Sequence, residues 1–282
     1  MKFESTLLVD LLACLFTSFV VHSFVPAVMV RGIITPIVKD KFGDLSSSSN
    51  YRPVMTSSVF LKVFEYCLSD KMSPYVKLND RQHGFRVSYS TGTACFTLKE
   101  TVMYYTQSHS DVYACFLDIK KAFDSVDHST LFQKMYEMGI PDCLIEVIRF
   151  WYCNQFAQVK YQNTLSKEWK ISNGVRQGGV LSGLLFNIYI NSLIDKVSKI
   201  NIGCKLGVIQ SNIVAYADDI VLLAPTRDGV KSLLSEVYME ASAIDLDFNF
   251  EKTKIMKFSS HMRKSARTFS KPLVLDGHSI HL

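Results

Sequence analysis

Apolar residues recur along this chain at two spacings, and each spacing predicts one kind of element. Spacings of three and four residues favour amphipathic helices, whereas alternation and short apolar runs favour strands. Short apolar runs predict strands at 112–119 and on either side of Asp218, and the alternating segment 156–175 predicts a β-hairpin. Helical spacing covers the segments 59–72, 94–107, 129–139, 141–154, 181–197 and 228–246. This order of elements indicates a mixed α+β protein.

The predicted helices also indicate inward faces and ends. Gly139 is placed to end the helix 129–139, and Pro141 suits the first turn of the helix that follows. In the segment 59–72 the expected inward side carries Val59, Val63, Tyr66 and Cys67, with Leu61 and Phe64 flanking it. In the segment 228–246 one stripe collects Val230, Leu233, Leu234, Val237, Tyr238, Ala241 and Ile244.

The first apolar stretch, residues 7–30, allows three interpretations: a signal peptide, a membrane span or a helix of the core. The first two need an uninterrupted apolar run, preceded in a signal peptide by clear positive charge. Asp10 and His22 interrupt the run, and Pro26 would break a spanning helix. We therefore interpret the stretch as a core helix and expect no membrane partner.

Composition narrows the class of protein. With 282 residues, 48% of them hydrophobic, the chain is long enough for one large domain or two closely packed subdomains. The net charge of +5 is compatible with a polyanionic partner. Seven cysteines without a C-x-x-C pair argue against a zinc knuckle or a disulfide scaffold and favour a reducing, intracellular compartment.

Three acids stand out because each interrupts an apolar strand pattern. Asp118 ends the run "VYACFLDI", and Asp218 and Asp219 lie inside "VAYADDIVLLA". If the two strands are neighbours, three carboxylates converge at one edge of a sheet, where each raises the pKa of the others. Two Mg²⁺ ions would resolve that repulsion and serve nucleotidyl transfer. Each segment by itself is more typical of a solvated turn or a helix start than of a metal site, so only their joint occurrence favours the metal site.

These acids belong to a series of motifs that resembles a known family. The motifs are, in order, "FVPAVMVRGIITPIVKD", "NYRPVMTSSVFLKVFEYCLSDKM", "RQHGFRVSYST", "CFLDIKKAFDSVDH", "SNGVRQGGVLSGLLFNIYINSLI", "AYADDIVL" and "FNFEKTKIMKF". Together they resemble the reverse transcriptase domain of non-long-terminal-repeat (LINE-type) retrotransposons, from about Leu11 to about His278.

The resemblance implies an α+β fold: the fingers and palm of a right-hand polymerase, with an antiparallel palm sheet packed on helices and the thumb missing. We expect residues 1–110 to form a fingers-like region with an N-terminal helix, and residues 111–282 to form the catalytic palm. The segment 271–282 resembles the start of the primer-grip hairpin, and we expect the chain to stop before this hairpin is complete. Without a thumb, duplex binding is expected to be weak and salt-dependent.

The resemblance also implies the metal site and its immediate surroundings. Asp118, Asp218 and Asp219 would hold two Mg²⁺ ions, or Mn²⁺ in their place, with the carbonyl of Ile119 as a further ligand. Phe123 would lie below the sugar and exclude a ribose 2′-hydroxyl, which favours deoxynucleotides. The alternative for Phe123 is an ordinary core aromatic.

Cations and glycines elsewhere acquire roles only through this resemblance. Lys39 and Arg52, and more weakly Arg86, would bind the incoming triphosphate. Gln177 and the adjacent Gly178 would contact the nascent base pair and the template, because glycine lets the backbone approach closely. Lys252 would protonate the leaving pyrophosphate.

The implied function is an RNA-directed DNA polymerase, a nucleotidyltransferase that adds dNTPs to a primer 3′-hydroxyl. Its partners would be an RNA template, a DNA primer and dNTPs, in the nucleus, the cytoplasm or both, while the oligomeric state stays open. Two alternatives remain: a truncated, catalytically inactive retrotransposon remnant that at most binds nucleic acid, and a membrane or secreted protein led by its apolar N-terminus.

Overall fold

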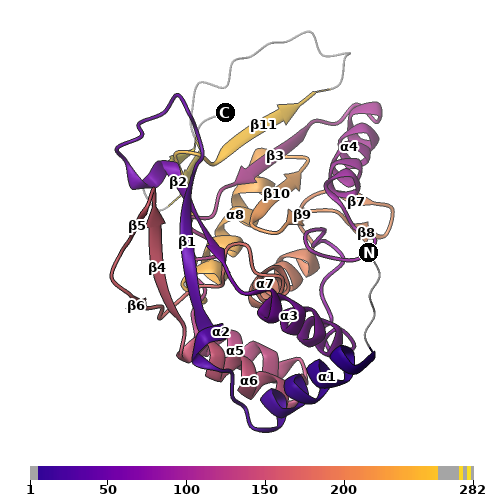
Figure 1. Ribbon diagram of the computed structural model, residues 1–282. Coiled ribbons are helices and arrows are strands. Elements are labelled where there is room, and N and C mark those ends of the chain that lie inside the picture. Colours follow the sequence, from indigo (N-terminus) through magenta and orange to yellow (C-terminus); the bar gives the residue numbers. More distant parts are fainter. Residues whose placement is uncertain (1–5, 260–272, 276–277, 281–282) are drawn as a thin grey trace. The chain divides into compact units, whose positions relative to one another are not determined.

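The computed structural model describes residues 6–259, 273–275 and 278–280 (Figure 1). The chain divides into two compact units, each assembled from two separate stretches. The first unit comprises residues up to Lys77 together with Val126–Leu185, and the second comprises Leu78–Ser125 and the chain from Phe186 onward. The boundary predicted after residue 110 falls inside the second unit, so the assignment of fingers and palm to chain segments stays a prediction.

The first unit is built on a sheet in which β1 (Arg31–Val38) lies between β2 (Tyr51–Thr56) and β4 (Phe156–Tyr161). β1 pairs antiparallel with β2 and parallel with β4. The short strands β5 (Thr164–Leu165) and β6 (Trp169–Lys170) both fold back onto β4, which confirms the hairpin predicted over 156–175.

The strands β1 and β2 were not predicted, and their prolines explain why. Pro36 and Pro53 stand opposite each other in this pair, although proline lacks the N–H that a strand interior normally needs. Lys39 N–H donates to the Asn50 carbonyl at 2.8 Å, one position beyond the last strand pair, Val38–Tyr51. Because hydrogen-bonded and non-bonded pairs alternate in an antiparallel ladder, the two prolines fall at a non-bonded pair and remove no ladder bond.

The helices of the first unit are α1 (Thr6–Val21), α2 (Ala27–Val30), α3 (Val59–Met72), α5 (His128–Glu137) and α6 (Asp142–Cys153), with a short 3₁₀ turn η1 (Ser48–Asn50). Three of them, α3, α5 and α6, fall where apolar spacing predicted them, and α1 lies in the apolar stretch 7–30; α2 and the 3₁₀ turn were not predicted. Gly139 has a φ of +75° just after α5, as expected of a residue that ends a helix. Pro141 is the N-cap of α6 and so lies one position before the predicted first turn.

The inward face predicted for α3 is wrong. Val59 and Tyr66 are 74% and 65% exposed, whereas the buried side carries Leu61, Phe64, Glu65, Leu68 and Met72. Those positions follow helical spacing without a gap, but the acid among them makes this side look less apolar than it is. Apolar residues occupy both sides of α3, so hydrophobicity alone selected the wrong one.

The helix predicted in the first apolar stretch is confirmed as α1, yet only part of it is buried. Phe16 and Phe19 pack against Phe64 of α3, with ring centroids 5.1 and 5.5 Å from that ring. Leu7 and Leu11, in contrast, are 67% and 59% exposed. The interpretation as a core helix therefore holds for the phenylalanine face alone. Over the described residues, no helix is both long and apolar enough to cross a membrane.

The second unit contains a four-stranded antiparallel sheet in the order β11 (Lys254–Phe258), β3 (Val112–Leu117), β10 (Asp219–Ala224) and β9 (Ile213–Tyr216). Helices α4 (Thr91–Gln107) and α8 (Arg227–Ser242) pack against it, as Figure 1 shows. The predicted α8 stripe is confirmed, since Val230, Leu233, Leu234, Val237 and Ala241 are buried. An antiparallel sheet packed on helices is thus present.

One long helix and two short ribbons complete the described part of the chain. α7 (Ser182–Lys199) is a long helix whose residues from Phe186 onward belong to the second unit. A two-stranded ribbon joins β7 (Lys205–Leu206) to β8 (Ile209–Gln210), and another joins β12 (Leu273–Leu275) to β13 (His278–Ile280). The second ribbon lies in the segment expected to begin a primer grip, a role that stays a prediction; the other residues of 271–282 lie outside the described ones.

Candidate active site

The three acids singled out in the sequence come from neighbouring strands of the second unit. Asp118 follows directly after β3, and Asp219 is the first residue of β10. β10 pairs antiparallel with β3, beginning with Ile220 opposite Leu117, so Asp118 and Asp219 come one position beyond that pair. The condition set by the sequence, that the two strands be neighbours, is therefore confirmed.

Asp218 lies in the two-residue turn that joins β9 to β10. The turn is bracketed by the pair Tyr216–Asp219, with Ala217 and Asp218 between them. Ala217 has a φ of +55°, the left-handed region that residues with a Cβ atom rarely adopt. The strained residue therefore directly precedes the first of the paired acids.

Burial and mutual repulsion raise the pKa of both paired carboxyls. For Asp218 the largest cause is loss of hydration, followed by the charges of Asp219 and Asp118, while a backbone hydrogen bond opposes the rise. For Asp219 the pKa is likewise raised, first by loss of hydration and then by the charge of Asp118. The acids thus form one coupled cluster of negative charge.

The side chains of the three acids are not arranged to bind one metal ion together. In the described residues no group of three or more His, Cys, Asp or Glu side chains is placed so that it could hold a metal ion. The carboxylate of Asp118 instead approaches the Lys252 ammonium, with Oδ2 and Nζ 3.9 Å apart. Both side chains are substantially exposed, so this contact holds Asp118 only loosely.

The backbone around Asp118 is fixed more firmly than its side chain. The Asn249 N–H donates to the Asp118 carbonyl and the Lys120 N–H donates to the Asp247 carbonyl, both at 2.8 Å. Ile119, 5% exposed, forms an antiparallel bridge with Phe248 between those two bonds. This pairing brings the loop that carries Lys252 alongside Asp118. Whether the Ile119 carbonyl binds a metal ion stays a prediction.

Phe123 belongs to an aromatic stack within the second unit. Its ring lies parallel to that of Phe186, with centroids 4.9 Å apart, and edge-on to Phe85 at 6.1 Å. The residue is half-buried. Packing of this kind fits a core aromatic and also a ring held rigidly beside a sugar, so both interpretations stand.

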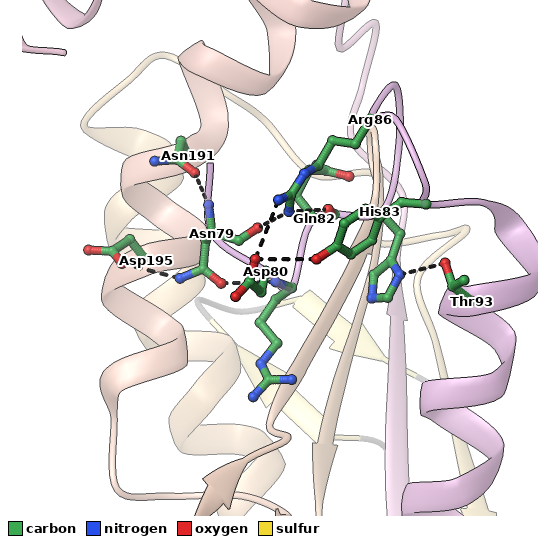
Figure 2. Close-up of polar contacts among 10 residues, drawn as sticks. Asn79, Asp80, Gln82, His83, Arg86, Thr93, Asn191 and Asp195 are labelled. Atoms are coloured by element: carbon green, nitrogen blue, oxygen red, sulfur yellow. Dashed lines mark hydrogen bonds and ion pairs between the residues drawn. The ribbon is translucent and has the colours of Figure 1, made fainter. Parts of the chain in front are cut away.

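Arg86 is engaged by its own loop. Its guanidinium donates to the carbonyls of Asn79 and Gln82 at 2.8 and 3.0 Å and pairs with Asp80 at 3.3 Å, and Figure 2 shows these contacts. It also lies 4.1 Å from the centre of the Tyr89 ring. These contacts give Arg86 a structural task, and its predicted contact with a triphosphate stays a prediction.

The remaining predicted residues lie in the first unit. Lys39 and Arg52 are exposed, on or next to the paired strands β1 and β2, and the Lys39 ammonium donates to the Ser49 carbonyl at 2.8 Å. Gln177 accepts a hydrogen bond at its carbonyl from the Met55 N–H at 2.9 Å, and Gly178 has a φ of +98°. Residues with a Cβ atom rarely adopt this conformation, which explains why a glycine stands at position 178.

Residues 38–269 match the family described as "Reverse transcriptase (RNA-dependent DNA polymerase)". The chain belongs to this reverse transcriptase family. The match spans well over half of the sequence and contains all three acids. It confirms the family to which the sequence motifs pointed.

Proteins of retrotransposable elements are similar to this reverse transcriptase domain. The chain is 28% identical over 204 residues to the Pol polyprotein of the type-2 retrotransposable element R2DM of Drosophila melanogaster, covering 72% of this chain and 19% of that protein. It is 29% identical over 187 residues to the Pol polyprotein of an R2 element of Nasonia vitripennis, covering 66% and 18%. The chain thus spans about a fifth of these relatives. The matches confirm a domain of the non-long-terminal-repeat kind.

Solved telomerase structures share the fold of this reverse transcriptase domain. A Candida tropicalis telomerase with a fragment of telomeric RNA has a TM-score of 0.60 and 14% identity, covering 89% of this chain and 43% of that one. The telomerase of Candida albicans, with a fragment of telomeric RNA, has a TM-score of 0.55 and 14% identity, covering 94% and 48%. This likeness confirms the expected fold class.

Sequence reasoning assigned no role to two buried polar residues. Glu65, 1% exposed, accepts the N–H groups of Val180 and of Leu181, the latter at 3.0 Å, just before α7 begins. Gln82, also 1% exposed, bonds to the turn that carries Asp218. For Glu65 the signal was an acid inside an apolar helical stripe; for Gln82 no pattern in a single sequence points to its partner.

Proposed function

We propose that this chain provides the fingers and palm of an RNA-directed DNA polymerase of a non-long-terminal-repeat retrotransposon. It would transfer deoxynucleotides from dNTPs to a primer 3′-hydroxyl opposite an RNA template. One observation carries the proposal: within a chain of the reverse transcriptase family, the pairing of β3 with β10 delivers Asp118, Asp218 and Asp219 to one end of an antiparallel sheet.

The donor atoms of this cluster fit Mg²⁺. All three side chains are carboxylates, the oxygen ligands that Mg²⁺ prefers, and burial together with their mutual repulsion raises the pKa of Asp218 and Asp219. A divalent cation would offset that repulsion, and Mn²⁺ takes the same ligands. Asp118 would have to turn from Lys252 to join the other two. Two such ions, when bound, stabilise the attacking and leaving oxygens of an in-line phosphoryl displacement.

The chain's own residues would position the substrates around the carboxylates. Lys252, exposed and next to Asp118, would donate a proton to the departing pyrophosphate. Phe123, held flat against Phe186, would crowd a ribose 2′-hydroxyl. In the first unit, Lys39 and Arg52 would bind the triphosphate.

The backbone of the first unit would serve the template. Gln177 and Gly178 would contact the nascent base pair, where the glycine, without a side chain, leaves room for a base. The partners would be an RNA template, a DNA primer and dNTPs, and the reaction would take place in the nucleus, the cytoplasm or both. No membrane enters the proposal.

Primer extension tests the proposal directly. The chain is mixed with an RNA template, an annealed DNA primer, Mg²⁺ and four dNTPs at low salt, because phosphate contacts weaken as salt rises. We expect incorporation that requires the divalent ion and the RNA template. Incorporation that survives the substitution Asp219→Ala would contradict the proposal.

A negative result has its own meaning. If the chain extends no primer yet binds the template–primer duplex with a steep salt dependence, it is a non-catalytic nucleic-acid-binding remnant. Filter binding at two salt concentrations separates these outcomes.

A further inference from the structure

The turn that presents the paired acids holds a backbone conformation that its own residues disfavour. Ala217 adopts a φ of +55° although its Cβ atom makes the left-handed region costly. Asp218 comes next, so the Ala217 peptide sets the direction in which the Asp218 side chain leaves the turn. Something outside the turn must hold this peptide.

Gln82 supplies that support through both ends of its carboxamide. Its Oε1 accepts the Ala217 N–H at 2.8 Å, and its Nε2 donates to the Ala217 carbonyl at 3.2 Å. The same Oε1 accepts the Gly84 N–H at 2.8 Å. Two backbone donors on one oxygen fix which end of the amide faces which way. With the side chain 1% exposed, water cannot substitute for these bonds.

The segment that carries Gln82 is itself held tightly against β9. The His83 N–H donates to the Ala215 carbonyl and the Ala215 N–H donates to the Arg81 carbonyl, both at 2.8 Å. At Gly84 a Cβ atom would collide with the Ala217 nitrogen, so only glycine permits this approach.

Helix α7 anchors the same segment from its other side. Asn187 donates to the Gly84 carbonyl at 2.7 Å. Asn191 accepts the Asn79 N–H at 2.8 Å, and Asp195 accepts from the Asn79 side chain at 3.1 Å; Figure 2 shows both contacts, together with the bond from His83 to Thr93 of α4. Helical residues four apart share a face, so one polar stripe of α7 supports the segment.

We infer that Gln82 is a positioning residue for catalysis: its carboxamide holds the Ala217 peptide in the left-handed conformation and thereby orients the Asp218 and Asp219 carboxylates. The inference rests on the proposed function for its catalytic consequence. Gln82 itself touches no substrate in this role. It acts on the acids only through the backbone of the turn.

Substitutions separate this role from ordinary stabilisation. Gln82→Met keeps the length of the side chain and removes both bonds to Ala217. Asn212→Leu is the matched control, because Asn212 is a fully buried amide of the same unit that donates to the Val197 and Ile202 carbonyls instead. Ala217→Gly removes the Cβ atom that makes the left-handed conformation costly.

The full chain is assayed for amide hydrogen exchange at Ala217, for Mn²⁺ affinity by electron paramagnetic resonance, and for primer extension. For Gln82→Met we expect about tenfold faster exchange at Ala217, weaker Mn²⁺ binding and an about tenfold lower kcat. Asn212→Leu should lower the Tm as much as Gln82→Met does, while leaving amide exchange at Ala217 and the Mn²⁺ affinity unchanged. Adding Ala217→Gly to Gln82→Met should restore part of the lost kcat. Adding it to Asn212→Leu should not raise kcat.

Equal losses of kcat and Mn²⁺ affinity in both variants at equal Tm, or unchanged exchange at Ala217 in Gln82→Met, would overturn the inference. A wild-type chain that extends no primer overturns the proposed function instead. In that case exchange at Ala217 and Mn²⁺ affinity still decide whether Gln82 orients the acids.

Discussion

Glu65 in the first unit and Asp218 in the second are both acids withdrawn from water, yet their neighbours differ in charge. Burial raises the pKa of Glu65, but backbone N–H groups and the positive charge of Arg176 oppose that rise. Burial also raises the pKa of Asp218, and there the charges of Asp219 and Asp118 add to it.

The difference separates an acid that serves the fold from acids that we propose serve a reaction. Glu65 faces two N–H groups at the start of a helix, where a negative charge is stabilising. Asp218 has carboxylates as its charged neighbours. Such a cluster of like charges does not stabilise a fold, but it can bind a divalent cation.

The first prediction concerns Asp218→Asn, which preserves shape and removes one charge. Primer extension should fall about 10³-fold, because the ligand for a cation that stabilises the transition state is weakened. The Tm measured without divalent ions should not fall, since a repulsive charge is lost. Asp228→Asn on the exposed start of α8 is the control, with activity retained. A lower Tm together with full activity would reverse the assignment of Asp218.

The second prediction is the opposite outcome for Glu65. Glu65→Leu would leave the Val180 and Leu181 N–H groups without their acceptor and Arg176 without its counter-charge, at a cost of about 3 kcal/mol in the free energy of unfolding. Denaturant titration measures this loss. Glu240→Gln removes the half-buried partner of the exposed Lys196 and should cost less than about 1 kcal/mol. A Glu65→Leu variant as stable as the wild type would remove the contrast.

The third prediction tests whether Phe123 only packs in the core or also selects deoxynucleotides over ribonucleotides. Phe123→Val should raise the use of ribonucleotides relative to deoxynucleotides about tenfold or more, since the ring no longer crowds the 2′-hydroxyl. Competition between the two nucleotide types in primer extension gives the ratio. Phe85→Val, at the edge-on member of the stack, should leave it unchanged. If both variants lose stability and neither changes the ratio, Phe123 is a core aromatic.

The fourth prediction is a pH dependence of stability. The pKa values of Asp218 and Asp219 are raised above the ordinary value of 3.8, so the folded chain disfavours their charged forms. Their destabilisation is absent below that ordinary value and develops as the pH rises through the folded pKa. Without divalent ions, the Tm of Asp218→Asn should therefore exceed that of the wild type at pH 7, by an amount that shrinks towards pH 4.

Calorimetry at both pH values checks this, and saturating Mg²⁺ should reduce the difference, because a bound ion stabilises the folded wild type. A difference in Tm that stayed constant between the two pH values would show that the charge of Asp218 is not its source.

Local pattern determined much of this protein. Apolar spacing placed α3, α4, α5, α6, α7 and α8, because a helix that buries one face must repeat its apolar residues every three or four positions. The acids were found for a related reason: Asp118, Asp218 and Asp219 interrupt apolar strands, where an uncompensated charge is costly. The family motifs predicted that the acids of the two strands form one site, and the two strands pair in the fold.

Tertiary structure decided what depends on partners distant in sequence. Pro36 and Pro53 are tolerated in β1 and β2 only because the register places them at a non-bonded pair. Glu65 turns the apparently polar side of α3 inward because N–H groups more than a hundred residues away satisfy it. Gln82 likewise bonds to Ala217, 135 positions along the chain. A sequence read locally contains the acids of the site, while the bonds that hold them in place exist only once the chain has folded.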